Sequence, residues 1–218
     1  MKVVIIGGVA GGATAAARLR RLDEQAEIVV FERSGYVSYA NCGLPYYIGG
    51  VIEDRSALTL QTPESFFARF RIDIRVRHEV TAIHPEKKTV LVKRLETGEV
   101  FEERYDKLIL SPGAKPTQPR LPGTGLDKVF TLRTVEDTFR IKDYILQHRP
   151  KSAVLAGGGF IGLELAENLR ELGLEFRRVL FRSLTRIWRP SSTVKCAGTA
   201  LSWLWAALWR VLSSGTAA

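Results

Sequence analysis

The spacing of apolar residues near the N-terminus predicts a strand, a turn, a helix and a second strand in that order. Val3–Ile6 is a short β-branched run, which is typical of a strand buried in a parallel sheet. Residues 13–22 are rich in Ala, Leu and Arg and favour a helix, and Ile28–Phe31 is a second apolar run. Because these elements fit within about thirty residues, they predict a βαβ unit and an α/β fold.

Alternating and periodic segments continue as far as residue 172. Thr62 and Pro63 are typical of the N-cap and the first position of a helix. Further elements are expected as strands over residues 72–76 and 79–83, a hairpin over 89–95 and 99–104, a buried strand over 108–110, a helix over 134–146, and a second βαβ unit with a strand from 153 and a helix over 160–172. Residues 111–125 hold four prolines and three glycines, which predicts a linker.

The pattern breaks after Phe176. All four tryptophans lie beyond it, and the strand ending in an acidic residue that should follow the second helix is missing. We therefore expect residues 177–218 to be a tail foreign to the fold, such as an out-of-frame extension, with a genuine but divergent C-terminus as the alternative. The uncharged run from Cys196 to Trp209 has 14 residues, short of the ~20 that a membrane span needs.

The positive charge is concentrated in the same tail. The net charge is +9, but residues 177–218 contain seven basic residues and no acidic one, which leaves +2 for residues 1–176. The body is therefore nearly balanced, and we expect neither a nucleic-acid partner nor a membrane. A basic, Trp-rich membrane or nucleic-acid binder remains as a rival class.

The two cysteines, Cys42 and Cys196, are too few for a disulfide-stapled secreted fold. The N-terminus runs directly into a strand and a glycine turn, so we expect no signal peptide. A reducing compartment fits these features, and the expected location is the cytoplasm.

A glycine-rich turn separates the first strand from the first helix. Its glycines at positions 7, 8, 11 and 12 allow a tight turn and close packing of helix on strand, while Val9 replaces the middle glycine of G-x-G-x-x-G. The helix N-terminus would face a pyrophosphate. Glu32 lies twenty residues after Gly12, at the end of the second strand, where a carboxylate can accept hydrogen bonds from a ribose. This combination predicts dinucleotide binding by Gly7, Gly8, Gly11, Gly12 and Glu32; an ordinary strand–helix turn is the alternative.

Cys42 lies in the segment SYANCGLPYYIGG, ten residues after Glu32. Ser38 and Asn41 offer polar contacts, and Gly43 leaves room beside the sulfur. A short helix is expected from Leu44, and its N-terminus would favour the reactive thiolate. The alternative is a buried structural cysteine.

This segment resembles the active-site sequence of coenzyme A disulfide reductases and the related single-cysteine NADH oxidases and persulfide reductases. Two-cysteine relatives such as glutathione reductase carry a second cysteine five residues away, where this chain has Val37 and Tyr47. The resemblance therefore implies that Cys42 is catalytic and cycles through a mixed disulfide with a small thiol or through a sulfenic acid. The sequence leaves open which of these two occurs.

The resemblance also implies a substrate-binding set. Thr14, Arg18 and Arg21 share one helix face through their i, i+4, i+7 spacing, and in the family this face holds the coenzyme A phosphates. Ser38 and Asn41 match the family's substrate-binding residues likewise. A solvated basic stripe is the alternative for the two arginines.

A second glycine turn gives a full G-x-G-x-x-G at Gly157, Gly159 and Gly162. Two such turns resemble the two-dinucleotide design of the family, with the first for FAD and the second for NADH or NADPH. The resemblance adds Arg33, Val80 and Gly113 to the expected cofactor contacts. Neither NADH nor NADPH is favoured, because the strand that normally decides this is expected to be lost in the tail. The three histidines show no catalytic or metal spacing, so we expect no metal.

The resemblance covers residues 1–176 and implies an FAD-dependent oxidoreductase that passes electrons from NAD(P)H through flavin and Cys42 to a coenzyme A disulfide or related persulfide. We expect an FAD-binding Rossmann-like βαβ domain with an antiparallel meander at residues 1–112, a linker and crossover helix at 113–150, and an incomplete nicotinamide-binding βαβ domain at 151–176. The family is homodimeric, but no dimerisation domain is recognisable here, so we expect the chain to be an incomplete fragment of the parent enzyme. NADH oxidase and a non-enzymatic flavin-binding module are the alternatives.

Overall fold

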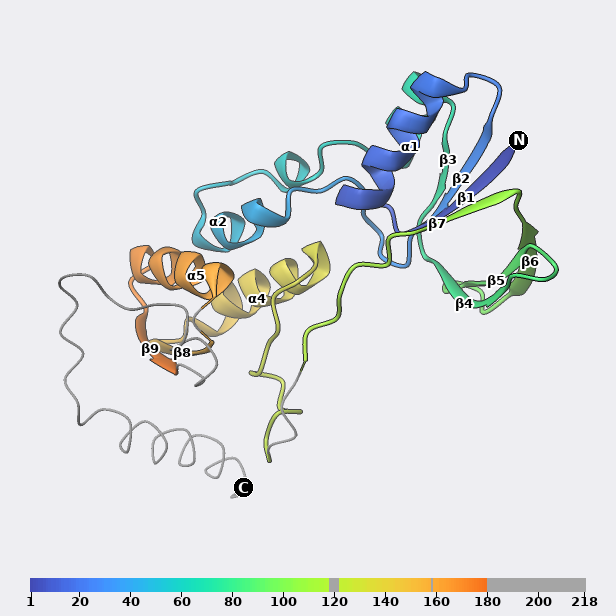
Figure 1. Cartoon of the computed structure of the whole chain (residues 1–218). Coiled ribbons are helices and arrows are strands. Elements are labelled where there is room, and N and C mark those ends of the chain that lie inside the picture. Colours follow the sequence, from blue (N-terminus) through green and yellow to red (C-terminus); the bar gives the residue numbers. More distant parts are fainter. Residues whose placement is uncertain (118–121, 158, 180–218) are drawn as a thin grey trace, which may run out of the picture. The chain divides into compact units, whose positions relative to one another are not determined.

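The computed structural model describes residues 1–117, 122–157 and 159–179. The chain divides into two compact units (Figure 1). The first unit comprises Met1–Asn41 and Asp54–Ala114, and the second comprises Cys42–Glu53 and the chain from Lys115 onward. The segment that contains Cys42 therefore belongs to the second unit, which no local pattern in the sequence indicated.

A four-stranded parallel sheet forms the centre of the first unit. Its order is β3-β2-β1-β7, with bounds Asp73–Arg75, Glu27–Phe31, Lys2–Ile6 and Lys107–Leu110. Val3, Val4 and Ile5 are fully buried because β1 lies between β2 and β7. The predicted βαβ unit is confirmed. Residues 108–110 form a strand as predicted, but the prediction that this strand is buried was wrong. Strand β7 lies at the sheet edge, and Leu110 is 59% exposed.

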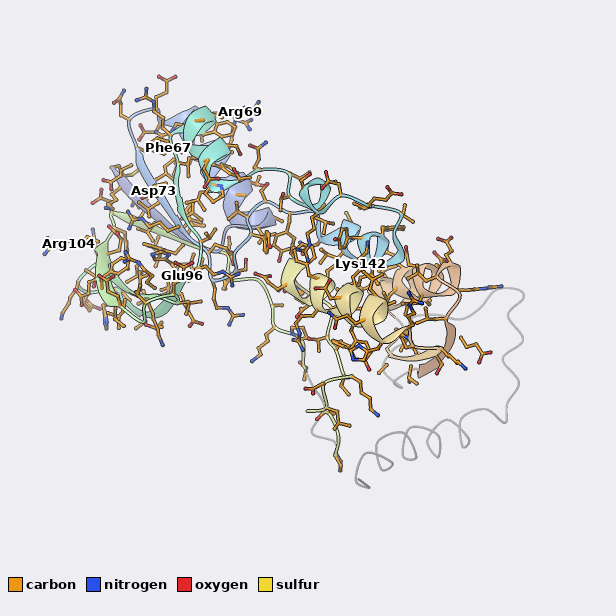
Figure 2. All side chains as sticks on the ribbon, turned by 180° about the vertical axis from the view of Figure 1, so that it is seen from behind. Phe67, Arg69, Asp73, Glu96, Arg104 and Lys142 are labelled. Carbon is orange, nitrogen blue, oxygen red and sulfur yellow. The ribbon has the colours of Figure 1, made fainter. Side chains whose placement is uncertain are left out.

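Two helices pack on one face of this sheet. Helix α1 (Ala10–Leu22) begins three residues before the expected start, and α3 (Pro63–Phe70) begins directly after its N-cap Thr62, as predicted. Thr62 and Ser65 form a capping box, in which each side chain binds the other's backbone N–H. Phe66 of α3 is buried, whereas its neighbour Phe67 is exposed (Figure 2). The core on this face consists of alternate strand residues with side chains from the helices and the following loop: Val3, Ile5, Ile28, Val30, Ile72, Ile74, Ala13, Ala16, Ala26, Phe66 and Val37.

A three-stranded antiparallel sheet covers the opposite face. Its strands are β4 (His78–His84), β5 (Thr89–Arg94) and β6 (Val100–Arg104), in that order. Val4, Val29 and Phe31 of the parallel sheet pack against Val90 and Val92 of β5. Because side chains along a strand alternate between faces, the same β1 and β2 supply both cores. The expected hairpin and meander are confirmed.

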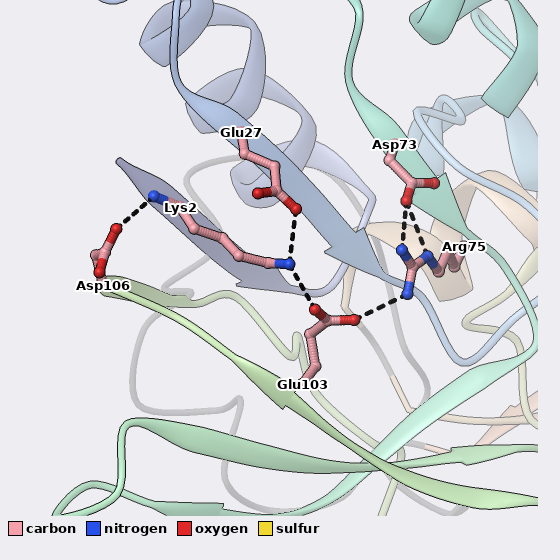
Figure 3. A network of polar contacts seen from close by, with 6 residues as sticks. All are labelled: Lys2, Glu27, Asp73, Arg75, Glu103 and Asp106. Atoms are coloured by element: carbon pink, nitrogen blue, oxygen red, sulfur yellow. Dashed lines mark hydrogen bonds and ion pairs between the residues drawn. The ribbon is translucent and has the colours of Figure 1, made fainter.

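A charged network joins the two sheets of the first unit (Figure 3). The Lys2 ammonium lies 2.6 Å from carboxylate oxygens of both Glu27 and Glu103. Glu103 on β6 also lies 2.9 Å from the Arg75 guanidinium, which in turn contacts Asp73 at 2.7 Å. Burial disfavours the charged Lys2, but hydrogen bonds and charges of Glu103 and Glu27 outweigh it, so the pKa of Lys2 lies above its ordinary 10.5.

Over its described residues, the second unit packs three α-helices and a pair of strands. Its elements are α2 (Leu44–Gly49), preceded by a 3₁₀ turn Asn41–Gly43, and then α4 (Val135–His148), β8 (Ser152–Ala156), α5 (Phe160–Glu171) and β9 (Glu175–Val179). Strands β8 and β9 are parallel, with Val154 opposite Arg177. Its buried core is formed by Ile48, Ile141, Leu169 and Leu174. The expected second βαβ unit is therefore present.

The strand after α5 corrects one expectation. Strand β9 pairs with β8 as far as Val179, so the strand that we expected to be lost is present, and regular structure continues three residues past the proposed break at 176. The remaining tail, from residue 180, lies outside the described residues, as does the residue that would carry the expected acid. Within the described residues, none of the helices has the length and apolar character needed to cross a membrane.

Candidate cofactor and cysteine site

The first glycine turn is held so tightly that two of its glycines admit no side chain. Gly7 has φ +98°, and a Cβ there would lie less than 3.0 Å from the carbonyl oxygen of Ser111. A Cβ on Gly12 would overlap the carbonyl oxygen of Gly7 and lie 3.2 Å from Cγ2 of Ile5. The close helix–strand approach inferred from the sequence is therefore present, and its close neighbours include the turn that follows β7.

The other two glycines line the same turn less tightly. A Cβ on Gly8 would lie 3.0 Å from Cγ1 of Val37, and one on Gly11 would lie 3.1 Å from the Ser111 hydroxyl. Val9, which replaces the middle glycine, is the N-cap of α1 and makes no capping hydrogen bond through its side chain. The first turn of α1 contains no acidic residue. A slim loop followed by an uncapped helix start suits the pyrophosphate of a dinucleotide.

Glu32 is buried behind this turn and bridges two backbone segments. Its Oε2 accepts a hydrogen bond of 2.7 Å from the Gly8 N–H, and its Oε1 accepts one of 2.8 Å from the Ser34 N–H. A carboxylate oxygen has more than one acceptor position, so these bonds leave capacity for a ribose hydroxyl. The ribose contact itself stays a prediction.

The segment before Cys42 is fixed to the first glycine turn. The Ser38 N–H donates to the Gly8 carbonyl oxygen at 2.9 Å, and Ser38 has a left-handed backbone with φ +47°. On its other side this segment pairs with residues 58–60, through Ala40 N–H to Leu58 O and Leu60 N–H to Ser38 O, both at 3.1 Å. Residues 58–60 were not among the sequence-predicted site residues, and a serine with positive φ gives no sequence signal.

Cys42 lies in the 3₁₀ turn immediately before α2, and its side chain is exposed and free. The alternative of a buried structural cysteine is therefore wrong. The short helix expected from Leu44 is present as α2, over Leu44–Gly49. Asn41 is half-buried beside the cysteine.

The expected phosphate-binding residues share an exposed face. Thr14, Arg18 and Arg21 are all exposed on α1, as their spacing predicts. Arg20 lies between them but has a different environment, because its guanidinium donates to the carbonyl oxygens of Phe70 and Arg71 at the end of α3 and of Asp23 and Glu24. Arg18 and Arg21 thus remain accessible to a ligand, while Arg20 ties α1 to α3.

The second glycine turn has more room than the first. Gly157 has φ +122°, and Gly159 is the N-cap of α5; a Cβ on either would meet nothing within 4 Å. A Cβ on Gly162 would lie 3.1 Å from the carbonyl oxygen of Gly157. The arrangement of strand, turn and helix is the one predicted for a second dinucleotide site.

Comparison with known proteins decides the family. The chain matches the pyridine nucleotide-disulphide oxidoreductase family over residues 1–193, which is most of its length. The chain belongs to the pyridine nucleotide-disulphide oxidoreductases. The resemblance inferred from the Cys42 segment and the two glycine turns is thereby confirmed.

Individual relatives of the chain agree with that assignment. The chain is 47% identical over 173 residues to a coenzyme A disulfide reductase of Staphylococcus aureus strain JH9, which covers 79% of this chain and 39% of the relative. Among solved structures, reduced Bacillus anthracis CoADR-RHD has a TM-score of 0.79 and 55% identity, covering 81% and 32% of the two chains. An NAD-dependent persulfide reductase from A. fulgidus has a TM-score of 0.78 and 37% identity, covering 82% and 34%.

These matches confirm the predicted fold and cofactor class, because the family and its matched members are FAD-dependent oxidoreductases that use a nicotinamide. The chain spans about 39% of the length of the curated relatives that it matches. The activity, substrate and partners of the whole protein are therefore taken up as proposals.

The remaining predicted cofactor contacts lie on three separate segments of the chain. Arg33 is exposed and pairs with Glu79 at 3.6 Å. Val80 lies beside a bulge in β4 and packs against the core between the two sheets. Gly113 is exposed with φ +73° in the turn after β7. Their contact with a cofactor stays a prediction.

Two of the three histidines, His78 and His148, have structural surroundings. His78 lies 2.7 Å from the Val76 carbonyl oxygen through Nδ1 and packs edge-on against Phe101. His148 stacks on Tyr144 with ring centroids 4.2 Å apart. No cluster of metal-binding side chains occurs among residues that the structure describes.

Proposed function

We propose that this oxidoreductase passes electrons from NADH or NADPH through FAD and Cys42 to a coenzyme A disulfide or a related persulfide. One observation carries the proposal: the exposed, free thiol of Cys42 follows a segment that is hydrogen-bonded to the first glycine turn through Ser38 and Gly8. The sequence around this thiol and the named relatives support the choice of a coenzyme A substrate.

The first glycine turn fits the proposed flavin cofactor. Side chains at Gly7 and Gly12 would clash with backbone atoms, so the turn stays open for a pyrophosphate only with these glycines. Glu32 would bind the ribose with the acceptor positions that Gly8 and Ser34 leave unused. FAD, when bound there, supplies two-electron chemistry between a nicotinamide and sulfur.

Cys42 performs the substrate step as the attacking nucleophile. Its thiolate would attack one sulfur of the disulfide, forming a Cys42–coenzyme A mixed disulfide and releasing the other half as a coenzyme A thiolate. The structure supports this role because the thiol is exposed and has no cysteine partner among the described residues. A reducing compartment such as the cytoplasm would keep the resting thiol available.

Substrate binding is proposed for the residues on α1 and in the cysteine segment. Arg18 and Arg21 are exposed on one helix face and would pair with the coenzyme A phosphates, with Thr14 beside them. Ser38 and Asn41 would contact the part of the substrate near the sulfur. The proposed partner is the coenzyme A disulfide or persulfide substrate, and the resemblance implies homodimers for the parent family only.

A single-turnover experiment tests the proposal without requiring the complete catalytic cycle. The reduced chain is mixed with coenzyme A disulfide, and released thiol and peptide masses are measured. We expect a coenzyme A adduct on the Cys42 peptide and one released thiol per adduct. Cys42→Ser should abolish both products, whereas Cys196→Ser should leave them unchanged. An unmodified Cys42, or equal modification of both cysteines, would contradict the proposal.

NADH oxidation by oxygen is the second candidate, because an exposed single thiol can also form a sulfenic acid. The two candidate functions differ in the covalent state of the Cys42 sulfur during turnover. Reconstituted with FAD and supplied with NADH in air, the reductase should show no sulfenic acid at Cys42, whereas an oxidase should accumulate one that a dimedone label detects. Retained FAD with neither adduct nor sulfenic acid would indicate a non-enzymatic flavin-binding module.

A further inference from the structure

Helix α2 begins two residues after Cys42, and a lysine of α4 binds its C-terminal half. The Lys142 ammonium donates a 2.7 Å hydrogen bond to the carbonyl oxygen of Tyr47, near the end of α2. The same nitrogen lies 3.9 Å from the centroid of the Tyr47 ring, and this ring makes an edge-to-face contact with Phe139 of α4 at a centroid distance of 5.5 Å. Figure 2 labels Lys142 on α4. A charged donor on a carbonyl and a cation over an aromatic face are both strong contacts for a side chain that is half-buried.

A second contact joins α2 to α5. Gly49 lies against Asn168, so closely that a Cβ at position 49 would approach the Asn168 amide and Cβ to less than 3.0 Å. Asn168 is 2% exposed, and its Nδ2 donates to the Glu164 carbonyl oxygen at 2.7 Å. Ile48 lies between these two contacts in the buried core of the second unit.

The geometry points to Lys142 as a positioning residue for Cys42, with the Gly49–Asn168 contact as its second support. Cys42 is two residues before α2, in a 3₁₀ turn that continues directly into the helix. Holding the end of α2 therefore restricts where the start of α2, and the sulfur, can lie. Calling this placement functional rests on the proposed role of Cys42, but the restraint on the thiol can be measured without that role.

Replacing Lys142 by a shorter, uncharged side chain should weaken the restraint on α2. In Lys142→Met the Tyr47 carbonyl loses its charged donor. Losing a hydrogen bond of this type should shift the equilibrium between held and released α2 toward release by about ten-fold or more. Lys142→Arg retains both a donor and a cation over the Tyr47 ring, so it should preserve most of the restraint. Lys151→Met makes the same chemical change at an exposed lysine of the second unit and is the matched control.

Two measurements on the full chain, with no flavin or substrate added, test the inference. Hydrogen exchange reports release of residues 44–52, and the rate of Cys42 alkylation by iodoacetamide, followed by peptide mass between about pH 6 and pH 9, reports the surroundings of the sulfur. In Lys142→Met we expect roughly ten-fold faster exchange and an alkylation profile shifted toward that of a free peptide of residues 36–48. Lys142→Arg should restore both, and Lys151→Met should match the unaltered chain.

The inference is overturned if Lys142→Met leaves the Cys42 profile unchanged, whether or not α2 exchanges faster. Faster exchange with an unchanged profile would show that Lys142 only stabilises the helix. This outcome would leave the proposed function intact, because it involves no coenzyme A. Conversely, a missing coenzyme A adduct together with the expected alkylation changes would refute the proposed function and leave the positioning role standing.

Discussion

The two glycine turns share the first and last glycines of G-x-G-x-x-G but differ in how closely the fold surrounds them. In the first turn, Gly7 and Gly12 face backbone oxygens that leave no room for a Cβ. In the second, a Cβ on Gly157 or Gly159 would enter open space, and a Cβ on Gly162 would lie 3.1 Å from the Gly157 carbonyl oxygen. The shared first and last glycines are therefore a strict steric requirement in the first unit and a looser one in the second.

The strands beside each turn explain this difference. Strand β1 has a neighbour on both sides, and the Ser111 turn after β7 closes directly over Gly7. Strand β8 pairs with β9 alone among the described strands of its unit. Glu32 also buttresses the first turn through Gly8, whereas the position after β9 lies outside the described residues. We infer that neighbouring segments, rather than the glycines themselves, fix the shape of such a turn.

The largest effect is expected for alanine at Gly12. The new Cβ would overlap the Gly7 carbonyl oxygen, so the turn must open and the free energy of unfolding should fall by more than about 3 kcal/mol. Gly162→Ala, at the equivalent position of the second turn, should change the free energy of unfolding by no more than about 1 kcal/mol. The higher helix propensity of alanine offsets the mild contact of its Cβ with the Gly157 carbonyl oxygen. Urea unfolding of both variants measures the difference. Equal losses would show that the two turns are packed alike.

Gly49→Ala tests the close packing of α2 on α5 in the second unit. Its Cβ would enter the space of the buried Asn168, so a loss of about 1–3 kcal/mol is expected. The neighbouring Gly50 has φ +86° and open space around it, so Gly50→Asn, which tolerates this backbone, should cost less than about 1 kcal/mol. Thermal unfolding followed by circular dichroism compares them. A harmless Gly49→Ala would contradict the close packing of α2 on α5.

Glu32→Gln tests the support behind the first turn. One of the two buried acceptors becomes an amide donor facing a backbone N–H, so a loss of about 1–3 kcal/mol is expected. Glu167→Gln, on the exposed surface of α5, is the control. Hydrogen exchange should show the loss at Gly8 and Ser34 before it appears elsewhere. Unchanged protection at these two amides would refute the role of the carboxylate as a brace.

The smallest effect is expected from the charged network of the first unit. The pKa of Lys2 is raised above 10.5 in the folded chain, so its contribution is complete below pH 10.5 and is lost as the pH rises through the raised value. Glu103→Gln removes a partner and should cost less than about 1 kcal/mol at neutral pH. The difference between the two chains should shrink above pH 10.5. A difference independent of pH would argue against the ion pair.

Local pattern was enough for most elements of the fold. These elements are set by residues close together in the sequence. Examples are the Thr62 cap, the two glycine turns, and the strand alternation that places Val3 and Val4 on opposite faces. The presence of β9 was missed, because an arginine-rich strand has no apolar alternation to mark it. The positive φ of Ser38 and the Lys142–Tyr47 bond, which spans 95 positions, arise from tertiary contacts that no local periodicity encodes.

A matched pair of charge insertions tests most directly whether the flavin binds at the first turn. Gly11 lies close only to the Ser111 side chain, and Gly159 is an N-cap in open space, so aspartate should fold at both positions. Its carboxylate would repel a pyrophosphate at whichever helix start it occupies. After reconstitution with FAD and desalting, the flavin-to-protein ratio measured by absorbance should fall sharply in Gly11→Asp and remain at the unaltered level in Gly159→Asp. Full flavin retention in Gly11→Asp would contradict the account.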